Sequence, residues 1–224
     1  FPNEHANFGG YLGYNIPRPQ VDIMLEADLI IALGTRLGDA TTQGYVLPQA
    51  PEPAQPLVHI YPDAYVPGKV YETELGLIYR SNEFVQALGV HTVPAPPAGR
   101  KEWIKRLNSH AKKLSEWSAS SAPDGLDFGF VIAELQKQIA DDAVIATDAG
   151  NFGSWLHRHF MFGKDHTLLG DVSGAMGMGV PAAVAAALRQ PKRQVICLVG
   201  DGGFMMTGNE LATAVQYELP IKIL

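Results

Sequence analysis

The sequence has little cysteine, little charge and no long apolar run, and each shortage excludes a class of protein. Its single cysteine, Cys197, has no partner for an internal disulfide, which is typical of a reducing compartment. No apolar stretch approaches the roughly 20 residues of a transmembrane helix, and no basic segment with a cleavage site opens the chain. The 17 basic and 23 acidic side chains leave a net charge of −6. This charge argues against nucleic acid or an anionic membrane as partner, and we expect a cytoplasmic protein.

What is present is enough apolar sequence for a large core. Hydrophobic residues make up 46% of the 224 residues, which suits one large domain or two ordinary ones. Phe1 stands where an initiator Met is usual, and the last four residues, 221–224, read as the start of a strand. We therefore expect an internal piece of a longer enzyme; the alternative is a processed chain that is complete in itself.

Short apolar runs alternate with helical patterns along the chain, which is typical of βαβ units. The predicted fold class is α/β, with two parallel-sheet domains that carry helices on both faces and are both apparently truncated. In the first domain we predict strands over 28–33, 57–61 and 76–79 and helices over 20–27 and 82–88. In the second we predict strands over 143–147, 167–169, 195–199 and 221–224, and helices over 128–139, 152–160, 180–188 and 209–218.

A proline-rich stretch and a basic helix separate the two domains. Pro94, Pro96, Pro97 and Gly99 break regular structure, and the pattern that follows predicts a helix over 100–118 with a solvated basic face. The predicted domains are listed by their limits: residues 1–93, a linker with the basic helix over 94–125, and residues 126–224. Asp127 is predicted to cap the first helix of the last domain.

Three predicted strand ends of the second domain carry glycine and acidic residues. Open parallel sheets bind ligands beyond the carboxyl ends of their strands, and glycines let backbone N–H groups approach an anion closely. The segments are 148–151, 170–179 and 200–203. A diphosphate suits this cluster. Because a carboxylate beside phosphates would repel them without a cation, Asp201 is predicted to bind Mg²⁺.

Each of these motifs is weak when taken alone. Gly200-Asp201-Gly202 also occurs as a simple tight turn, and the glycines over 174–179 do not meet the G-x-G-x-x-G pattern of dinucleotide sites. Met205 and Met206 follow the glycine turn, and we expect them to be core residues rather than part of a substrate pocket. The order and the spacing of the motifs carry more information than any one of them.

Four segments resemble thiamine-diphosphate-dependent enzymes, and within them the acetolactate synthase large-subunit group. Residues 200–224 resemble the cofactor motif of that family, residues 173–183 its aminopyrimidine segment and residues 147–151 its first diphosphate loop. Residues 26–39 resemble part of its central domain. The resemblance implies that this chain carries the later part of a central domain and the first half of a diphosphate-binding domain.

By the same resemblance, each motif residue has an implied role. Asp201 would bind Mg²⁺, and Met176 would hold the cofactor bent, so that its 4′-imino group reaches the thiazolium C2 proton. The implied cofactor-binding residues are Gly150, Asn151, Gly174, Ala175, Met176, Gly200, Gly202 and Gly203.

The implied reaction is decarboxylation of a 2-oxo acid, followed by transfer or release of the resulting enamine, that is, a carboligase or decarboxylase. In the family, the activating Glu lies in a pyrimidine domain and a second Mg²⁺ ligand, an Asn, follows the last strand. Neither is present here, so we expect the fragment alone to be inactive. The full-length protein is expected to be a homodimer or homotetramer acting on a small 2-oxo acid.

A flavin site is a separate question in the first domain. Acetolactate synthases hold FAD there, and Arg36, Asp39 and Asp63 fall in the matching regions. The family's acidic residue near the end of the second strand is replaced by Tyr61, and related enzymes keep this domain without flavin. We expect no bound FAD, with an FAD site as the alternative. Arg36 and Asp63 could equally be loop residues or a surface ion pair.

Two other functions stay open at this point. A dinucleotide-dependent oxidoreductase would also combine two α/β units with glycine turns, although no true G-x-G-x-x-G follows a strand. A non-catalytic binding module could keep the fold and lack the chemistry. Binding of thiamine diphosphate or of a nicotinamide dinucleotide discriminates between them.

Overall fold

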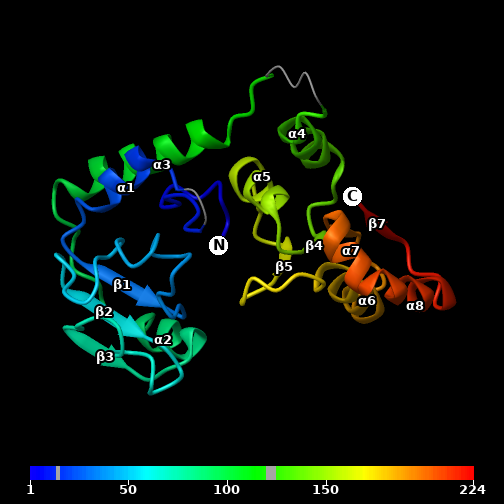
Figure 1. The fold of residues 1–224 in the computed structure, drawn as a ribbon. Helices are drawn as coiled ribbons and strands as arrows, with labels where there is room; N and C mark the ends of the chain where they lie inside the picture. Colours follow the sequence, from blue (N-terminus) through cyan, green and yellow to red (C-terminus); the bar gives the residue numbers. More distant parts are fainter. Residues whose placement is uncertain (14–15, 120–124) are drawn as a thin grey trace. The chain divides into compact units, whose positions relative to one another are not determined.

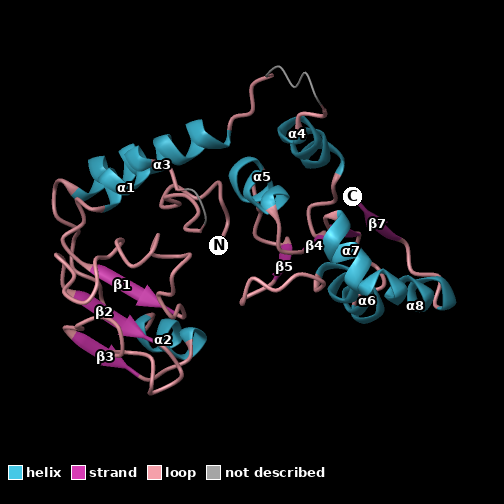
Figure 2. Cartoon of the chain, viewed as in Figure 1, coloured by secondary structure: helices cyan, strands magenta, loops and turns pink. Residues whose placement is uncertain are grey.

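The computed structural model of this protein describes residues 1–13, 16–119 and 125–224. Within these ranges the chain forms two compact α/β units, whose elements are labelled in Figure 1 and coloured by type in Figure 2. The N-terminal unit is Gly9–Ala111, and the C-terminal unit combines Phe1–Phe8 with Lys112–Leu224. No helix in the described ranges is both long enough and apolar enough to cross a membrane.

The N-terminal unit is built on a three-stranded parallel sheet in the order β1-β2-β3. Its strands are β1 (Ile30–Leu33), β2 (Leu57–Ile60) and β3 (Leu75–Leu77), and its helices α1 (Arg18–Met24) and α2 (Ser81–Leu88). Each predicted element of this unit is found, with ends that differ by a few residues. The core on one side of the sheet consists of Ala32, Leu37, Leu57 and Tyr71.

The predicted basic helix is α3 (Arg100–Ser115), and it packs on α1. The indole Nε1 of Trp103 donates to the carbonyl oxygen of Ile23 at 2.8 Å, and Arg106 pairs with Glu26. Leu107 is buried, whereas the lysines of the helix are exposed, as predicted. The division between the two units falls inside this helix, so the limits 1–93, 94–125 and 126–224 stay a prediction.

The C-terminal unit is built on a four-stranded parallel sheet in the order β5-β4-β6-β7. Its strands are β4 (Val144–Thr147), β5 (Thr167–Gly170), β6 (Val195–Leu198) and β7 (Ile221–Ile223). Its helices are α4 (Phe128–Gln138), α5 (Asn151–His159), α6 (Gly179–Arg189), α7 (Asp201–Thr207) and α8 (Leu211–Gln216), with a 3-10 turn over Gly208–Glu210. Asp127 caps α4 as predicted, because its side chain accepts from the Gly129 N–H at 2.9 Å.

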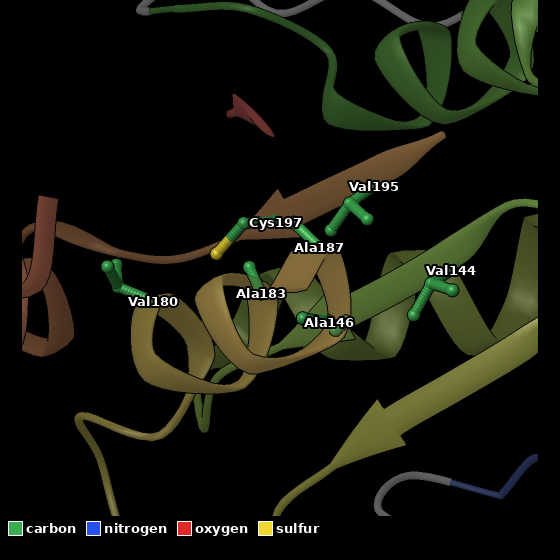
Figure 3. Packing of buried hydrophobic residues seen from close by; sticks show 8 residues of the cluster. Val144, Ala146, Val180, Ala183, Ala187, Val195 and Cys197 are labelled. Atoms are coloured by element: carbon green, nitrogen blue, oxygen red, sulfur yellow. The ribbon is translucent and has the colours of Figure 1, made fainter. Parts of the chain in front are cut away.

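Helices cover both faces of this second sheet. On one face the small residues of α6 pack on β4 and β6; Figure 3 shows Val180 and Ala183 of α6 with Ala146 and Cys197 of the strands. On the other face Ile132 of α4, Leu156 of α5 and Phe160 pack against Ile145 and Leu198. The predicted two-sided α/β arrangement is confirmed here, and it buries β4 and β6 completely.

The segment after β6 differs from the expectation. Instead of a turn followed by a helix over 209–218, α7 begins directly at Asp201, and the next helix begins only at Leu211. Two glycines disfavour a helix by about 1 kcal/mol each, which is why the local sequence predicts a turn. Met205 and Met206 lie on the outside of α7, 83% and 59% exposed, so the prediction that they are core residues is wrong.

Candidate functional site

Three strands of the C-terminal sheet end at the same edge. In the parallel register Thr147 of β4 lies beside Gly170 of β5 and beside Leu198 of β6. The segments that follow, which begin at Asp148, Asp171 and Val199, therefore start side by side. These are the strand ends that the sequence marks as candidate ligand-binding loops.

Asp148, the first residue after β4, holds the loop that precedes α6. Its carboxylate is 4% exposed and accepts from the Ala149 N–H at 2.7 Å and from the Gly177 N–H at 2.9 and 3.0 Å. It also accepts from the Gly179 N–H at 3.0 Å. A carboxylate can stay buried when N–H donors satisfy its oxygens, so Asp148 fixes the backbone around it.

The start of α7 also packs directly against Asp148. A Cβ atom added at Gly203 would lie 2.8 Å from Oδ2 of Asp148, and one added at Gly179 would lie 3.1 Å from its Cβ. These distances are shorter than ordinary contacts, so both positions need glycine for close approach. The end of β4, the start of α6 and the start of α7 thus meet around one carboxylate.

A second aspartate, Asp171, shapes the first half of the same loop. It accepts from the Ser173 backbone N–H at 3.2 Å and from the Ser173 hydroxyl at 3.0 Å. Burial acts to raise the pKa of Asp171, but these hydrogen bonds, with those from the N–H groups of Ala175 and Gly174, outweigh it and hold the pKa below its ordinary value. The Asp171 side chain is therefore ionised near neutral pH, and it stabilises the turn in which it lies.

Met176 lies between the segments that these two aspartates hold. Gly174 and Gly177 on either side have φ angles of +80° and +95°, in the left-handed region that favours glycine. The Met176 side chain is 46% exposed, and a Cβ added at Gly202 would lie 2.7 Å from its Cε. The loop therefore presents Met176 against the first turn of α7, beside Asp201.

The remaining predicted site residues lie at the starts of α5 and α7. Gly150 and Gly200 are the N-cap residues of these two helices, and the residues that follow them, Asn151 and Asp201, are exposed. A Cβ added at Gly200 would lie 3.4 Å from Cε1 of Phe152 in α5, so the two helix starts are neighbours.

The charges at this edge suit a diphosphate bound together with a cation. Oδ1 of the exposed Asp201 accepts a local bond from the Gly202 N–H at 2.8 Å. Within residues 1–13, 16–119 and 125–224, no group of three or more His, Cys, Asp or Glu side chains could hold a metal ion. Mg²⁺ is often held by one or two carboxylates together with phosphate oxygens and water, so the donor set fits a metal that shares its ligands with a phosphate.

Cys197 lies close to this edge but is chemically inert. The side chain is fully buried in β6 (Figure 3). Burial, and secondarily the negative charge of Asp148, raises the pKa of its thiol to about 12. The thiol therefore stays protonated and takes no part in chemistry at neutral pH.

Sequence reasoning missed three residues of this edge, namely Asp148, Asp171 and Thr207. The Thr207 hydroxyl donates to the carbonyl oxygen of Gly177 at 2.9 Å. The two aspartates had a local signal similar to that of Asp201, an acidic residue within a few residues of a strand end and followed by glycine. No local signal marks Thr207, because its partner lies 30 residues away in the sequence.

The flavin candidates of the N-terminal unit are loop residues. Arg36, Asp39 and Asp63 are all exposed, and Oδ1 of Asp63 accepts from the Tyr65 N–H at 2.9 Å in a local turn. In the described part of the chain no ion pair joins Arg36 to Asp63. The absence of FAD stays a prediction.

Two domain models of one family match the chain. Residues 1–88 match the central domain of thiamine pyrophosphate enzymes, and residues 148–224 match their C-terminal TPP-binding domain. Thiamine pyrophosphate is another name for thiamine diphosphate. The second match begins at Asp148 and therefore contains every predicted site residue described above, from Gly150 to Gly203.

Similar proteins align along almost the whole chain. The protein YdaP of Bacillus subtilis is 34% identical over 99% of this chain and 38% of its own length. The acetolactate synthase large subunit of Corynebacterium glutamicum is 31% identical over 100% of this chain and 36% of its own length. Sulfoacetaldehyde acetyltransferase of Castellaniella defragrans is 25% identical over 99% of this chain and 41% of its own length.

The chain thus spans about two fifths of the length of these relatives. Its two sheets, the order of its motifs and both domain matches agree with one another. The chain belongs to the thiamine pyrophosphate enzyme family, and it carries sequence of the central and the C-terminal TPP-binding domains.

Proposed function

We propose that this chain is part of a Mg²⁺-dependent thiamine diphosphate enzyme of the acetolactate synthase type. The full-length enzyme decarboxylates a 2-oxo acid and transfers or releases the remaining fragment, as a carboligase or decarboxylase. It acts in the cytoplasm as a homodimer or homotetramer. The relatives named as acetolactate synthase large subunits support this reaction class.

The observation that carries the proposal is the convergence of three glycine-containing segments at one sheet edge. Asp148 contacts the loop before α6 and the start of α7, and Met176 lies against Gly202. The exposed side chains of Asn151, for a diphosphate contact, and of Asp201, for the cation, lie at the starts of the two neighbouring helices. Glycines let the backbone N–H groups come close to a diphosphate, and a carboxylate oxygen can bind the cation that accompanies it.

The roles of the residues follow from this arrangement. Asp201 would bind Mg²⁺, while Gly150, Asn151, Gly200, Gly202 and Gly203 would surround the diphosphate. The backbone of Gly174 and Ala175 would meet the aminopyrimidine, and Met176 would support the bent cofactor. When bound, thiamine diphosphate supplies a nucleophilic carbon and an electron sink for decarboxylation. The protein orients it and keeps water away.

Calorimetric titration of the full-length protein with thiamine diphosphate, with and without Mg²⁺, tests the proposal. We expect binding that depends on Mg²⁺, and we expect Asp201→Ala to abolish the Mg²⁺-dependent part because the diphosphate charge is then uncompensated. Asp141→Ala is the matched control: Asp141 is also exposed but precedes β4, at the opposite end of the strand.

Two outcomes of the titration would contradict the proposal. Unchanged Mg²⁺ dependence in Asp201→Ala would remove this residue from the metal site. Binding of a nicotinamide dinucleotide by the wild-type protein, without binding of thiamine diphosphate, would favour an oxidoreductase instead.

A further inference from the structure

The peptide groups on both sides of Gly177 are held by two side chains, those of Asp148 and Thr207, to which the proposed function gives no contact with the cofactor. The Gly177 N–H donates to both oxygens of Asp148, at 2.9 and 3.0 Å, and its carbonyl oxygen accepts from the Thr207 hydroxyl at 2.9 Å. Asp148 follows β4, and Thr207 is the last residue of α7. Three segments far apart in the sequence therefore meet at one glycine.

The environment of Asp148 makes this contact rigid. Its side chain is 4% exposed, and it accepts further bonds from the N–H groups of Ala149 and Gly179, at 2.7 and 3.0 Å. Hydrogen bonds to a charged acceptor are roughly twice as strong as neutral ones. Because its oxygens already have backbone partners and water is excluded, Asp148 acts on conformation rather than as a cation ligand.

These bonds at Gly177 also fix the position of Met176, the residue before it. Gly177 has a φ angle of +95°, so its backbone conformation sets the direction in which the chain leaves Met176. The Met176 side chain reaches Gly202, the residue after Asp201. Through Gly177 and Thr207, the Met176 loop is therefore tied to the helix that begins with Asp201.

We propose that Asp148 and Thr207 are positioning residues that hold Gly177, and with it Met176, in the cofactor-binding conformation before the cofactor arrives. This inference rests on the proposed function, since it concerns the same thiamine diphosphate site. A loop that is already ordered binds more tightly, because binding then costs no conformational entropy of ordering.

Three threonine variants test the role of the hydroxyl. Thr207→Val removes the hydroxyl at nearly constant volume, and Thr207→Ser keeps it. Thr213→Val makes the same change in α8, at a side chain that forms no hydrogen bond with the residues that the structure describes. In the cofactor-free protein we expect faster amide hydrogen exchange over residues 171–179 in Thr207→Val only. The Kd for thiamine diphosphate with Mg²⁺ should rise about tenfold, the effect of losing one hydrogen bond.

Asp148→Asn tests the other side of Gly177. The amide keeps the size of the side chain but replaces one acceptor oxygen by a donor that faces the N–H groups of Gly177 and Gly179. We expect a larger rise in Kd than for Thr207→Val and the same local rise in exchange. Thr207→Val is the milder change and keeps the test valid should Asp148→Asn fail to fold.

The outcomes separate this inference from the proposed function. If the wild-type protein binds thiamine diphosphate with Mg²⁺ and folded Asp148→Asn and Thr207→Val bind equally well, the positioning role is overturned while the function stands. Failure of Thr207→Ser to restore both readouts also overturns it. Absence of binding by the wild-type protein overturns the proposed function itself.

Discussion

The two sheets of this protein follow the same strand-and-helix alternation but differ in how well they are covered. In the C-terminal unit β4 and β6 are buried along their whole length, between α6 on one face and α4 and α5 on the other. In the N-terminal unit the central strand β2 is also largely buried, but the outer strands are more exposed: Ile31 of β1 is 57% and Leu75 of β3 is 48% exposed, against 37% for Leu168 of the outer strand β5.

The reason for the difference is the helix layer. The amphipathic helix α2 of the N-terminal unit buries none of its residues, whereas α6 buries six. A site whose backbone groups must stay in place needs close packing around it. The candidate cofactor edge accordingly lies on the sheet that is covered on both faces.

The largest effect is expected for the alkylation rate of Cys197, which should differ strongly between folded and unfolded protein. This thiol lies in the C-terminal sheet and reports on that sheet alone. Because the folded thiol has a pKa of about 12 against an ordinary 9.0, it stays protonated and buried, so native protein should resist alkylation by iodoacetamide. Urea-unfolded protein should react readily. Mass spectrometry follows the reaction, and alkylation that is equally fast in both states would show that the C-terminal sheet does not shield this side chain.

The same thiol makes the free energy of unfolding depend on pH. The raised pKa means that the unfolded state releases its proton first, so the thiol's contribution to stability is present below pH 9.0 and is lost as the pH rises toward about 12. A Cys197→Ala variant, compared with wild type by urea unfolding across this range, isolates that contribution. Identical pH slopes for the two proteins would contradict it.

The next largest effect comes from a pair of isoleucines. Ile145 in β4 is fully buried, so Ile145→Ala should cost about 2–5 kcal/mol of the free energy of unfolding. Ile31→Ala in β1 should cost less than about 1 kcal/mol, because that side chain is already largely in water. Urea unfolding measures both, and hydrogen exchange assigns each transition to its unit. Equal costs would contradict the contrast between the sheets.

The smallest expected effect comes from a pair of glycines. A Cβ at Gly203 would lie 2.8 Å from a carboxylate oxygen of Asp148 that backbone N–H groups hold in place, so Gly203→Ala should destabilise by about 1–3 kcal/mol. Gly38→Ala in the N-terminal unit meets nothing within 4 Å and should change stability by less than about 0.5 kcal/mol. Thermal unfolding compares them. A stabilising Gly203→Ala would mean that helix propensity outweighs crowding at this position.

The local sequence predicts most of the fold because the alternation of short apolar runs with helical patterns is strong along most of the chain. Every predicted strand is found, including β7, and Asp127 caps α4 as expected. It fails at α7, whose two glycines lower helix propensity and whose start packs closely against Asp148. It fails again at Met205 and Met206, which are exposed on that helix.

The sequence by itself determined the alternation of strands and helices, the glycine-rich strand ends and the family, because these depend on residue order and spacing. It predicted a metal ligand in Asp201 but gave Asp148 and Asp171 no role, although all three stand near a strand end and near glycines. Tertiary structure separated them: Asp148 is buried against backbone N–H groups, Asp171 shapes its own turn, and Asp201 faces solvent. The physical reason is that a carboxylate's role depends on which donors and how much water surround it, and distant segments supply both.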